Sequence, residues 1–101
     1  MITIRMSEGE WQQLVPGVFF KLLFTDRERG TITSLVKLLP GTYLPQHHHQ
    51  GIEECLIVEG DFHIDEEVFG PGDYQCALPG STHQTLYTQN GALVLIVAAH
   101  S

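Results

Sequence analysis

Turn residues recur along this chain at intervals of about ten positions, and this spacing restricts the fold more than any other feature. Glycine, often beside proline or asparagine, separates short runs of apolar and β-branched residues. Such punctuation is typical of an all-β sandwich or barrel. The turn positions are Pro16-Gly17, Gly30, Pro40-Gly41, Gly60, Gly70-Pro71-Gly72, Pro79-Gly80 and Asn90-Gly91.

The runs between these turns are rich in Val, Ile, Leu, Thr and aromatic residues, which favour strands. Residues 7–14 are the one segment that suggests a short helix, because Ser7 can cap it with Glu10 three residues on. A further strand or an ordered arm is the alternative for that segment. We therefore predict an all-β chain whose strands cover residues 18–24, 31–39, 54–59, 74–78, 83–88 and 92–99.

The length of 101 residues predicts a single domain. Hydrophobic residues make up 43% of the chain and charged residues 17%, which is the composition of a folded protein rather than a disordered one. A domain of this size buries only about 60–70% of the surface that its unfolded chain exposes. A bound metal or a partner subunit would therefore add to its stability.

The chain is acidic, with a net charge of −7 from 12 acidic and 5 basic residues. Nucleic-acid binders normally carry a basic stripe, so we expect no binding to DNA or RNA. The longest apolar stretch, Ala92–Ala99, is far too short to span a bilayer. No signal peptide is recognised, and Cys55 and Cys76 do not make a disulfide scaffold. These observations predict a soluble cytoplasmic protein that does not bind membranes.

Two of the expected strands, residues 18–24 and 92–99, are apolar on both faces. An antiparallel barrel that stands alone usually has polar residues on its outer face. Part of the outside is therefore expected to be covered. A second subunit, giving a homodimer, is the simplest cover, and an N-terminal segment that folds back over the barrel is the alternative.

Three consecutive histidines at positions 47–49 form the most distinctive segment of the chain. Side chains alternate faces along a strand, so His47 and His49 share one face and His48 takes the other. Two imidazoles spaced in this way can converge on one metal ion. Glu53 follows after a Gln-Gly pair that can bend the chain, and His83 comes from a distant turn.

Three imidazoles and one carboxylate make a ligand set that suits Fe, Zn, Ni or Mn, and also Co or Cu. We therefore predict one divalent transition metal per chain, bound by His47, His49, Glu53 and His83, with a position left for water or substrate. Glu54 is the rival of Glu53, and strand alternation favours Glu53. The alternative interpretation is a histidine-rich surface loop without a function, which has to explain all four positions together.

The histidine segment resembles the first motif of the cupin family at every fixed position of the motif. The spacing is Gly41-x5-His47-x-His49-x3-Glu53-x6-Gly60. The second cupin motif is matched more loosely, at Gly72, Gly80 and His83. The segments HHHQGIEECLIVEGDF, GPGDY and LPGSTH are similar to those of the ChrR-type cupins.

This resemblance covers residues 30–97 and implies a single cupin domain over residues 1–101, with residues 1–17 as an N-terminal arm. The fold would be an RmlC-like jelly-roll β-barrel that holds the metal inside through the same four residues and often forms a homodimer. ChrR-type cupins occur as the C-terminal domain of zinc-dependent anti-sigma factors and as free-standing small proteins. Some similar chains are described as acetylacetone-cleaving dioxygenases. No helical zinc-binding domain like that of the anti-sigma factors is recognised in this sequence, which argues against direct inhibition of a sigma factor.

The residues around the metal follow from strand alternation. Counting by twos from Glu53 puts Cys55 and Ile57 on the inward face, and counting from His83 puts Thr85 and Tyr87 there. No Arg or Lys falls at a predicted inward position near the metal. Such a lining fits a small neutral organic ligand. No nucleophile motif such as Gly-x-Ser-x-Gly is present, so no catalytic side chain is assigned.

Two functional hypotheses remain. The first is a metal-dependent enzyme similar to a dioxygenase, acting on a small neutral organic substrate. The second is a non-enzymatic regulatory module, similar to ChrR, that senses a metal or a small ligand. The sequence favours the enzyme, because no effector domain is recognised in it, although a fold by itself does not determine function.

Overall fold

The computed structural model describes residues 1–44, 47–48, 51–83 and 85–99, with the backbone alone at residues 47, 48 and 83. Within these residues the chain forms twelve strands in three sheets and no helix, so the predicted all-β class is confirmed. No helix long and apolar enough to cross a membrane is present in this part of the chain.

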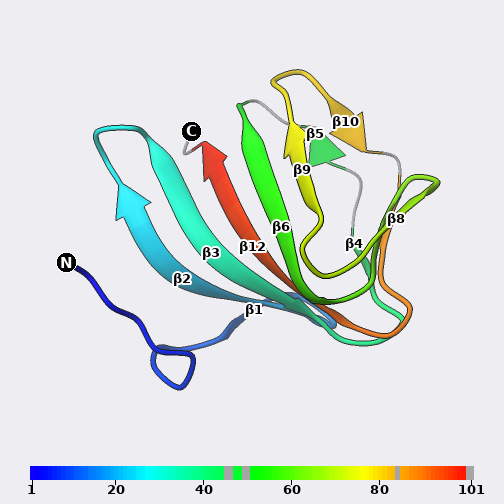
Figure 1. The fold of residues 1–101 in the computed structure, drawn as a ribbon, viewed down its shortest axis with the longest axis horizontal. Coiled ribbons are helices and arrows are strands. Elements are labelled where there is room, and N and C mark those ends of the chain that lie inside the picture. The colour runs from blue at the N-terminus through cyan, green and yellow to red at the C-terminus, as the bar shows by residue number, and fades with distance from the viewer. Residues whose placement is uncertain (45–46, 49–50, 84, 100–101) are drawn as a thin grey trace.

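The sheets form two facing layers (Figure 1). The larger sheet has the order β1–β2–β3–β12–β6–β9, and all of its neighbouring strands are antiparallel. Its strands are β1 (Gln12–Val15), β2 (Val18–Asp26), β3 (Thr31–Leu38), β12 (Ala92–Ala99), β6 (Glu53–Gly60) and β9 (Tyr74–Ala77).

The opposite layer is built from short strands. A four-stranded sheet has the order β4–β11–β7–β8, and a two-stranded ladder pairs β10 with β5. Their bounds are β4 (Tyr43–Leu44), β11 (Leu86–Tyr87), β7 (Phe62–Ile64), β8 (Glu67–Phe69), β10 (Thr82–His83) and β5 (His47–His48).

Most of the predicted long strands are present with small shifts at their ends, and β12 has the predicted bounds. The run at 83–88 is divided between β10 and β11, and the short strands β7 and β8 were not predicted. The prediction of a short helix at residues 7–14 was wrong. Gly9 adopts a left-handed φ of 83° and Gln12–Val15 pairs with β2, so the strand alternative describes this segment.

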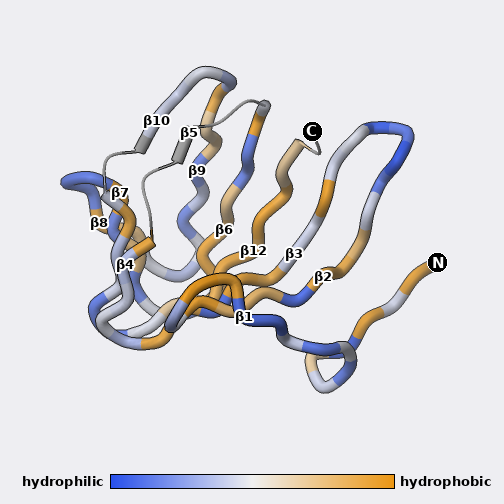
Figure 2. The backbone as a smooth tube through the Cα atoms, turned by 180° about the vertical axis from the view of Figure 1, so that it is seen from behind, coloured by the Kyte–Doolittle hydropathy of each residue, from blue (hydrophilic) through white to orange (hydrophobic). Residues whose placement is uncertain are grey.

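The core lies between the two layers, at the end of the larger sheet where its strands converge. Val18, Leu38 and Val94 are at most 2% exposed and pack in one cluster with side chains of the facing sheet such as Phe62 and Leu86. Figure 2 shows the same pattern, with hydrophobic residues along the middle strands and hydrophilic residues at the tips of the hairpins. Burial of these aliphatic side chains is the main source of the fold's stability.

The last glycine of the first cupin motif has a structural role. Gly60 ends β6 with a φ of 84°, and an added Cβ would collide with the carbonyl oxygen of Gly91, the residue before β12. A side chain at this position would force the two strands apart. The motif glycine thereby keeps β6 in register beside β12.

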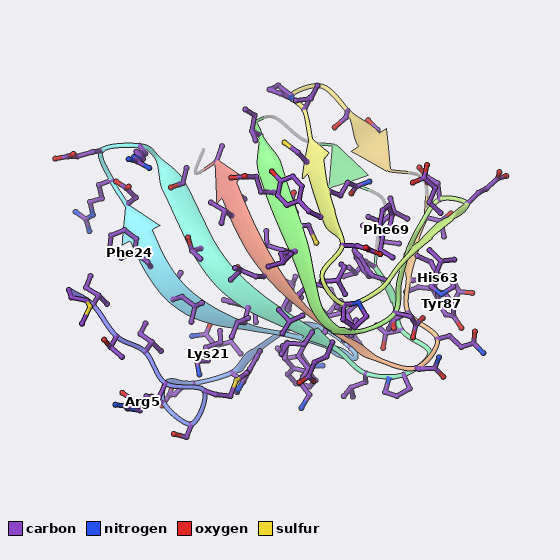
Figure 3. All side chains as sticks on the ribbon, in the orientation of Figure 1. Arg5, Lys21, Phe24, His63, Phe69 and Tyr87 are labelled. Atoms are coloured by element: carbon purple, nitrogen blue, oxygen red, sulfur yellow. The ribbon has the colours of Figure 1, made fainter. Side chains whose placement is uncertain are left out.

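The N-terminal segment covers part of the larger sheet's outer face. Lys21, which is 1% exposed, donates hydrogen bonds to the carbonyl oxygens of Arg5 (3.1 Å) and Met6 (2.9 Å) and lies 5.8 Å from the centre of the Trp11 ring. Figure 3 shows Arg5 beside Lys21 on this side of the sheet. The segment therefore accounts for some of the apolar outer surface on β2.

Candidate metal centre and its cavity

The two-stranded ladder brings two of the predicted metal ligands together. β10 runs antiparallel to β5, with His83 directly opposite His47 and Thr82 directly opposite His48. Residues directly opposite each other in an antiparallel ladder belong to the same face of it. The register therefore assigns His47 and His83 to one face and His48 to the other. His49 lies outside the described residues.

The two neighbouring glutamates face opposite sides of β6. Glu53, at the start of the strand, is half-buried and lines a cavity between the layers. Glu54 accepts a hydrogen bond of 2.7 Å from the Tyr74 hydroxyl on the exposed side. This bond to a carboxylate raises the pKa of Tyr74 above its ordinary value. Of the two carboxylates, Glu53 is the one directed into the molecule.

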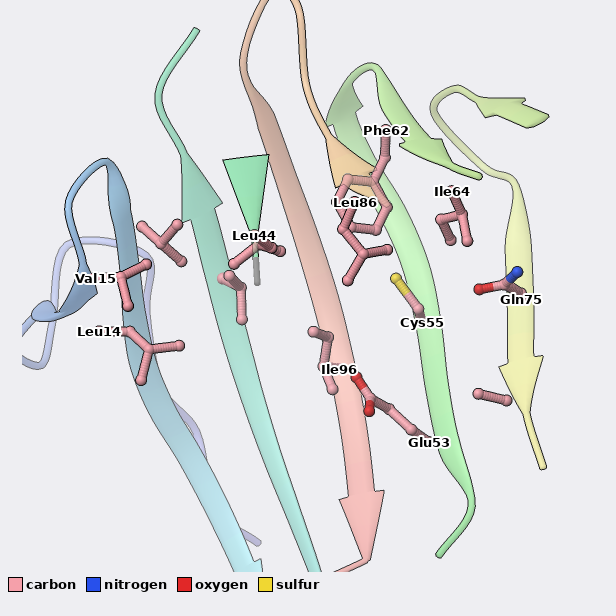
Figure 4. A pocket seen from close by; sticks show the side chains of 13 residues that line it. Leu14, Val15, Leu44, Glu53, Cys55, Phe62, Ile64, Gln75, Leu86 and Ile96 are labelled. Atoms are coloured by element: carbon pink, nitrogen blue, oxygen red, sulfur yellow. The ribbon is translucent and has the colours of Figure 1, made fainter. Parts of the chain in front are cut away.

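The cavity has a volume of about 410 Å³ and lies above the core. Its walls come from both layers and from the β1–β2 hairpin, and Figure 4 shows them from close by. Among the described residues that line it, Glu53, Cys55 and Gln75 carry polar side-chain groups and the others are apolar. The apolar residues are Leu14, Val15, Val18, Val36, Leu44, Phe62, Ile64, Ala77, Leu86 and Ile96.

The predicted pocket residues fall into two groups. Cys55 lines the cavity, and Ile57, two residues further along β6, is buried in the core below it. Burial and the nearby charge of Glu53 raise the pKa of the Cys55 thiol to about 12, so at neutral pH this side chain is uncharged. Thr85 and Tyr87 were predicted to point inward, but Leu86 between them lines the cavity instead.

This difference arises because the strand is interrupted. β10 ends at His83 and β11 begins at Leu86, so side-chain alternation does not carry from one to the other. The connection is held by the tip of the β7–β8 hairpin. The Thr85 N–H donates to the Asp65 carboxylate (3.0 Å), and the Asp65 N–H donates to the Thr85 carbonyl (2.9 Å).

Tyr87 belongs to an aromatic row on the outer face of the four-stranded sheet. Its ring lies 4.4 Å from that of Tyr43 and 5.3 Å from that of His63, between centroids. The ladder pairs Tyr87 with both residues. Figure 3 shows His63 and Tyr87 together on the side away from the larger sheet.

The carboxylate of Asp61 anchors this side of the molecule. It accepts hydrogen bonds of 2.9 Å from the backbone N–H groups of Gln89 and Asn90 and lies 2.9 Å from the Nε2 atom of His63. Burial acts to raise the pKa of Asp61, but the hydrogen bonds outweigh it and hold the pKa below its ordinary value. Asp61 therefore joins the start of β7 to the turn before β12.

Sequence reasoning missed several lining residues that come from distant strands. Gln75 lies in β9 directly opposite Cys55, and Ile96 lies in β12 on the other side of Cys55. Leu14 and Val15 reach the cavity from the N-terminal hairpin. The segment YQCA of β9 shows no alternation of apolar and polar residues that would reveal which side faces inward.

The family profile of the ChrR Cupin-like domain matches residues 1–101. The chain belongs to this family. The predicted relation to ChrR-type cupins is therefore confirmed. A curated relative, the anti-sigma-E factor ChrR of Cereibacter sphaeroides, is 33% identical over 73 residues. The matched residues make up 72% of this chain and 33% of the relative, so the chain corresponds to about a third of the relative's length.

Solved structures agree with the cupin fold. The complex of Rhodobacter sphaeroides SigE with the anti-sigma ChrR matches with a TM-score of 0.80 at 28% identity, over 93% of this chain and 50% of that one. An acetylacetone dioxygenase from Acinetobacter johnsonii matches at 0.86 and 14% identity, over 98% and 74% of the two chains. An RmlC-like cupin from Shewanella frigidimarina matches at 0.83 and 18% identity, over 97% and 89%. The predicted RmlC-like jelly roll is therefore confirmed.

Proposed function

We propose that this cupin binds one divalent transition metal and acts as a dioxygenase-like enzyme on a small neutral organic substrate. The observation that supports the proposal is the cavity, in which the Glu53 carboxylate meets walls that are otherwise almost entirely hydrocarbon. A half-buried carboxylate directed into a cavity is a suitable ligand for a divalent transition metal. The metal would lie at the end of the cavity where Glu53 is located.

The proposed ligands are His47, His49, Glu53 and His83. The pairing of His83 with His47 supports this set, because cross-strand neighbours have Cβ atoms only about 5 Å apart. Imidazole and carboxylate donors suit Fe, Zn, Ni or Mn. When bound, such a metal would supply a Lewis acid and, in the case of iron, the capacity to react with dioxygen.

The walls of the cavity have a separate role in this proposal. Apolar side chains such as Phe62, Leu86 and Ile96 would hold the hydrocarbon part of the substrate and exclude water. None of the described lining residues is Lys or Arg, so the walls offer no cationic side chain to an anionic substrate. A neutral β-diketone is the class that we propose.

The test begins with elemental analysis of protein purified without an affinity tag. Oxygen uptake by the iron-loaded protein is then measured with 2,4-pentanedione and related diketones. We expect turnover that is lost in His47→Ala and kept in Glu54→Gln, since Glu54 bonds Tyr74 on the outer side. Equal activity in the His47→Ala protein, or none in the wild type across these substrates, contradicts the proposal.

A regulatory module is the second candidate. The observation that favours it is sequence identity, which is 33% and 28% in the two alignments with ChrR but 14% to the acetylacetone dioxygenase. In this case the metal would be zinc, which has no redox chemistry, and the barrel would act by binding a partner protein. Stoichiometric zinc together with no oxygen uptake by the iron form would support this candidate over the enzyme.

We also propose that two copies associate through the outer face of the larger sheet. Leu35, Leu95 and Leu56 lie in register across β3, β12 and β6 and form an uncharged row. In a face-to-face pair with its two-fold axis along β12, β3 of one copy lies over β6 of the other. Lys37 on β3 would then approach Glu59 on β6 of the second copy.

A further inference from the structure

Gln75 stands out among the cavity residues because its polar group has no evident structural task. The side chain is half-buried on the inner face of β9. Within the described part of the chain, the Gln75 amide forms no hydrogen bond. A primary amide in mostly hydrocarbon walls offers two donors and an acceptor to whatever enters the cavity.

The position of Gln75 relates it to the candidate metal centre. It lies directly opposite Cys55 in the β6–β9 ladder, and Glu53 lies two residues from Cys55 on the same face of β6. Two residues along a strand span about 7 Å. Figure 4 shows the Gln75 side chain on β9 beside Cys55, with its amide oxygen on the side of Cys55. Rotation about the last side-chain bond would turn the Nε2 atom to that side. A small molecule can therefore reach Gln75 at one end while its other end lies near Glu53.

The chemistry of the walls restricts what Gln75 can bind. The amide is uncharged, and the described lining residues around it include Ile64, Ala77 and Cys55, none of which is Lys, Arg, Asp or Glu. A carbonyl oxygen on a mainly hydrocarbon molecule satisfies the amide donor and leaves no charge buried. A hydrocarbon of the same shape would leave this donor without its partner.

We propose that Gln75 determines specificity by donating a hydrogen bond from its Nε2 atom to a carbonyl oxygen of a small neutral ketone. The proposal rests on the proposed function in taking this cavity as the substrate site, and it names the group that selects the substrate. Sites built to hydrogen-bond a ligand reject analogues that lack the matching atom, because the polar group of the site is then unpaired. Gln75 is thus a binding residue and takes no part in bond making.

The experiment compares two ligands of nearly equal shape, cyclohexanone and methylenecyclohexane. Their dissociation constants are measured by calorimetric titration of zinc-loaded and metal-free protein. We expect the wild type to bind the ketone about three- to tenfold more tightly than the alkene. In Gln75→Leu this ratio should fall to about one. Gln13→Leu, which changes an exposed glutamine on β1 that does not line the cavity, should keep the wild-type ratio.

A second variant, Gln75→Met, keeps the length of the side chain and serves if the leucine variant unfolds. An unchanged ratio in the folded Gln75 variant overturns the inference, and so does a wild type that binds neither ligand or does not distinguish them. Oxygen uptake is measured separately. If the preference for the ketone disappears in the Gln75 variant but no oxygen uptake is found, the role of Gln75 is supported and the dioxygenase is rejected. If oxygen uptake is found but the Gln75 variant keeps the preference, the dioxygenase is supported and the role of Gln75 is rejected.

Discussion

The two ends of the larger sheet differ in how closely the opposite layer approaches them. At the closed end, around Leu38, Val94 and Ile57, the side chains are at most 3% exposed. At the open end, the strands spread apart in Figure 1 and Leu22 is 53% exposed although it lies on the same side of β2 as Val18. Sheet twist produces such divergence between packed layers.

This difference shows that a single strand can contribute side chains both to the hydrophobic core and to the cavity. On β6, Ile57 packs at the closed end, while Cys55 and Glu53 face the cavity at the open end. Side chains alternate between the inner and outer face of β6 in the same way at both ends of the sheet. The distance to the facing layer decides whether an inward side chain stabilises the fold or remains available to a ligand.

The largest expected effect separates the two ends directly. Ile57→Ala removes a side chain that is 3% exposed and leaves a void, so we expect it to lower the free energy of unfolding by about 2–5 kcal/mol. Ile96→Ala enlarges an existing cavity and should cost about 1 kcal/mol. Denaturant unfolding of both variants measures the difference. Equal losses would mean that the open end is as closely packed as the closed end.

Metal binding should stabilise the open end. At a hundredfold excess over its dissociation constant, a metal that binds only the folded chain adds about 2.7 kcal/mol. For a domain of this length the melting temperature should rise by about 10–20 °C. Calorimetry before and after chelation measures the gain.

His47→Ala should abolish this gain, and His48→Ala serves as the matched control because the β5–β10 register assigns His48 to the other face. A melting curve that chelation does not change, or a gain that depends on His48, would argue against the proposed ligands.

The next effect concerns Asp61, which directly precedes strand β7 of the four-stranded sheet. Asp61→Asn should lower stability by about 1–2 kcal/mol at neutral pH, because the charged acceptor of two backbone N–H groups is lost. The pKa of Asp61 is lower in the folded chain than its ordinary value. Its contribution is therefore present above about pH 4 and is lost as the pH falls through the folded pKa.

The difference between Asp61→Asn and the wild type should accordingly shrink in acid. Unfolding curves of both proteins, recorded from pH 7 down to the lowest pH at which they still fold and at matched ionic strength, measure this difference in the free energy of unfolding. A difference that stays constant down to low pH would show that the charge of Asp61 is not what stabilises the turn before β12.

The smallest effect on stability is expected at the outer face. Leu95→Asp places charge in the apolar row of β12 and should convert a dimer to a monomer while changing monomer stability by about 1 kcal/mol or less. Val68→Asp, on the outer face of the four-stranded sheet, is the control and should keep the dimer. Light scattering at micromolar concentration gives the masses. A monomeric wild type would reject the proposed association.

Prediction from sequence succeeded where one regular strand carried the pattern. Alternation along β6 put Glu53 and Cys55 on one face and Glu54 on the other, and in the structure Glu53 and Cys55 line the cavity while Glu54 bonds Tyr74. The role of Glu53 as a metal ligand stays a prediction. Alternation failed at Thr85 and Tyr87, because β10 ends at His83 and a separate strand, β11, begins at Leu86, which lines the cavity in their place. Short strands such as β7 were also missed, since three residues are too few to show a period.

The sequence by itself determined the all-β class, the family and the residues that make up the cupin motif, because turn residues and motif spacing are local properties of the chain. The tertiary structure alone decided that Gln75 faces Cys55, that Val94 is buried while Leu95 faces outward, and that the layers diverge above the core. These are outcomes of pairing between strands far apart in the sequence. Pairing of that kind is set by packing and twist over the whole sheet, which no single segment encodes.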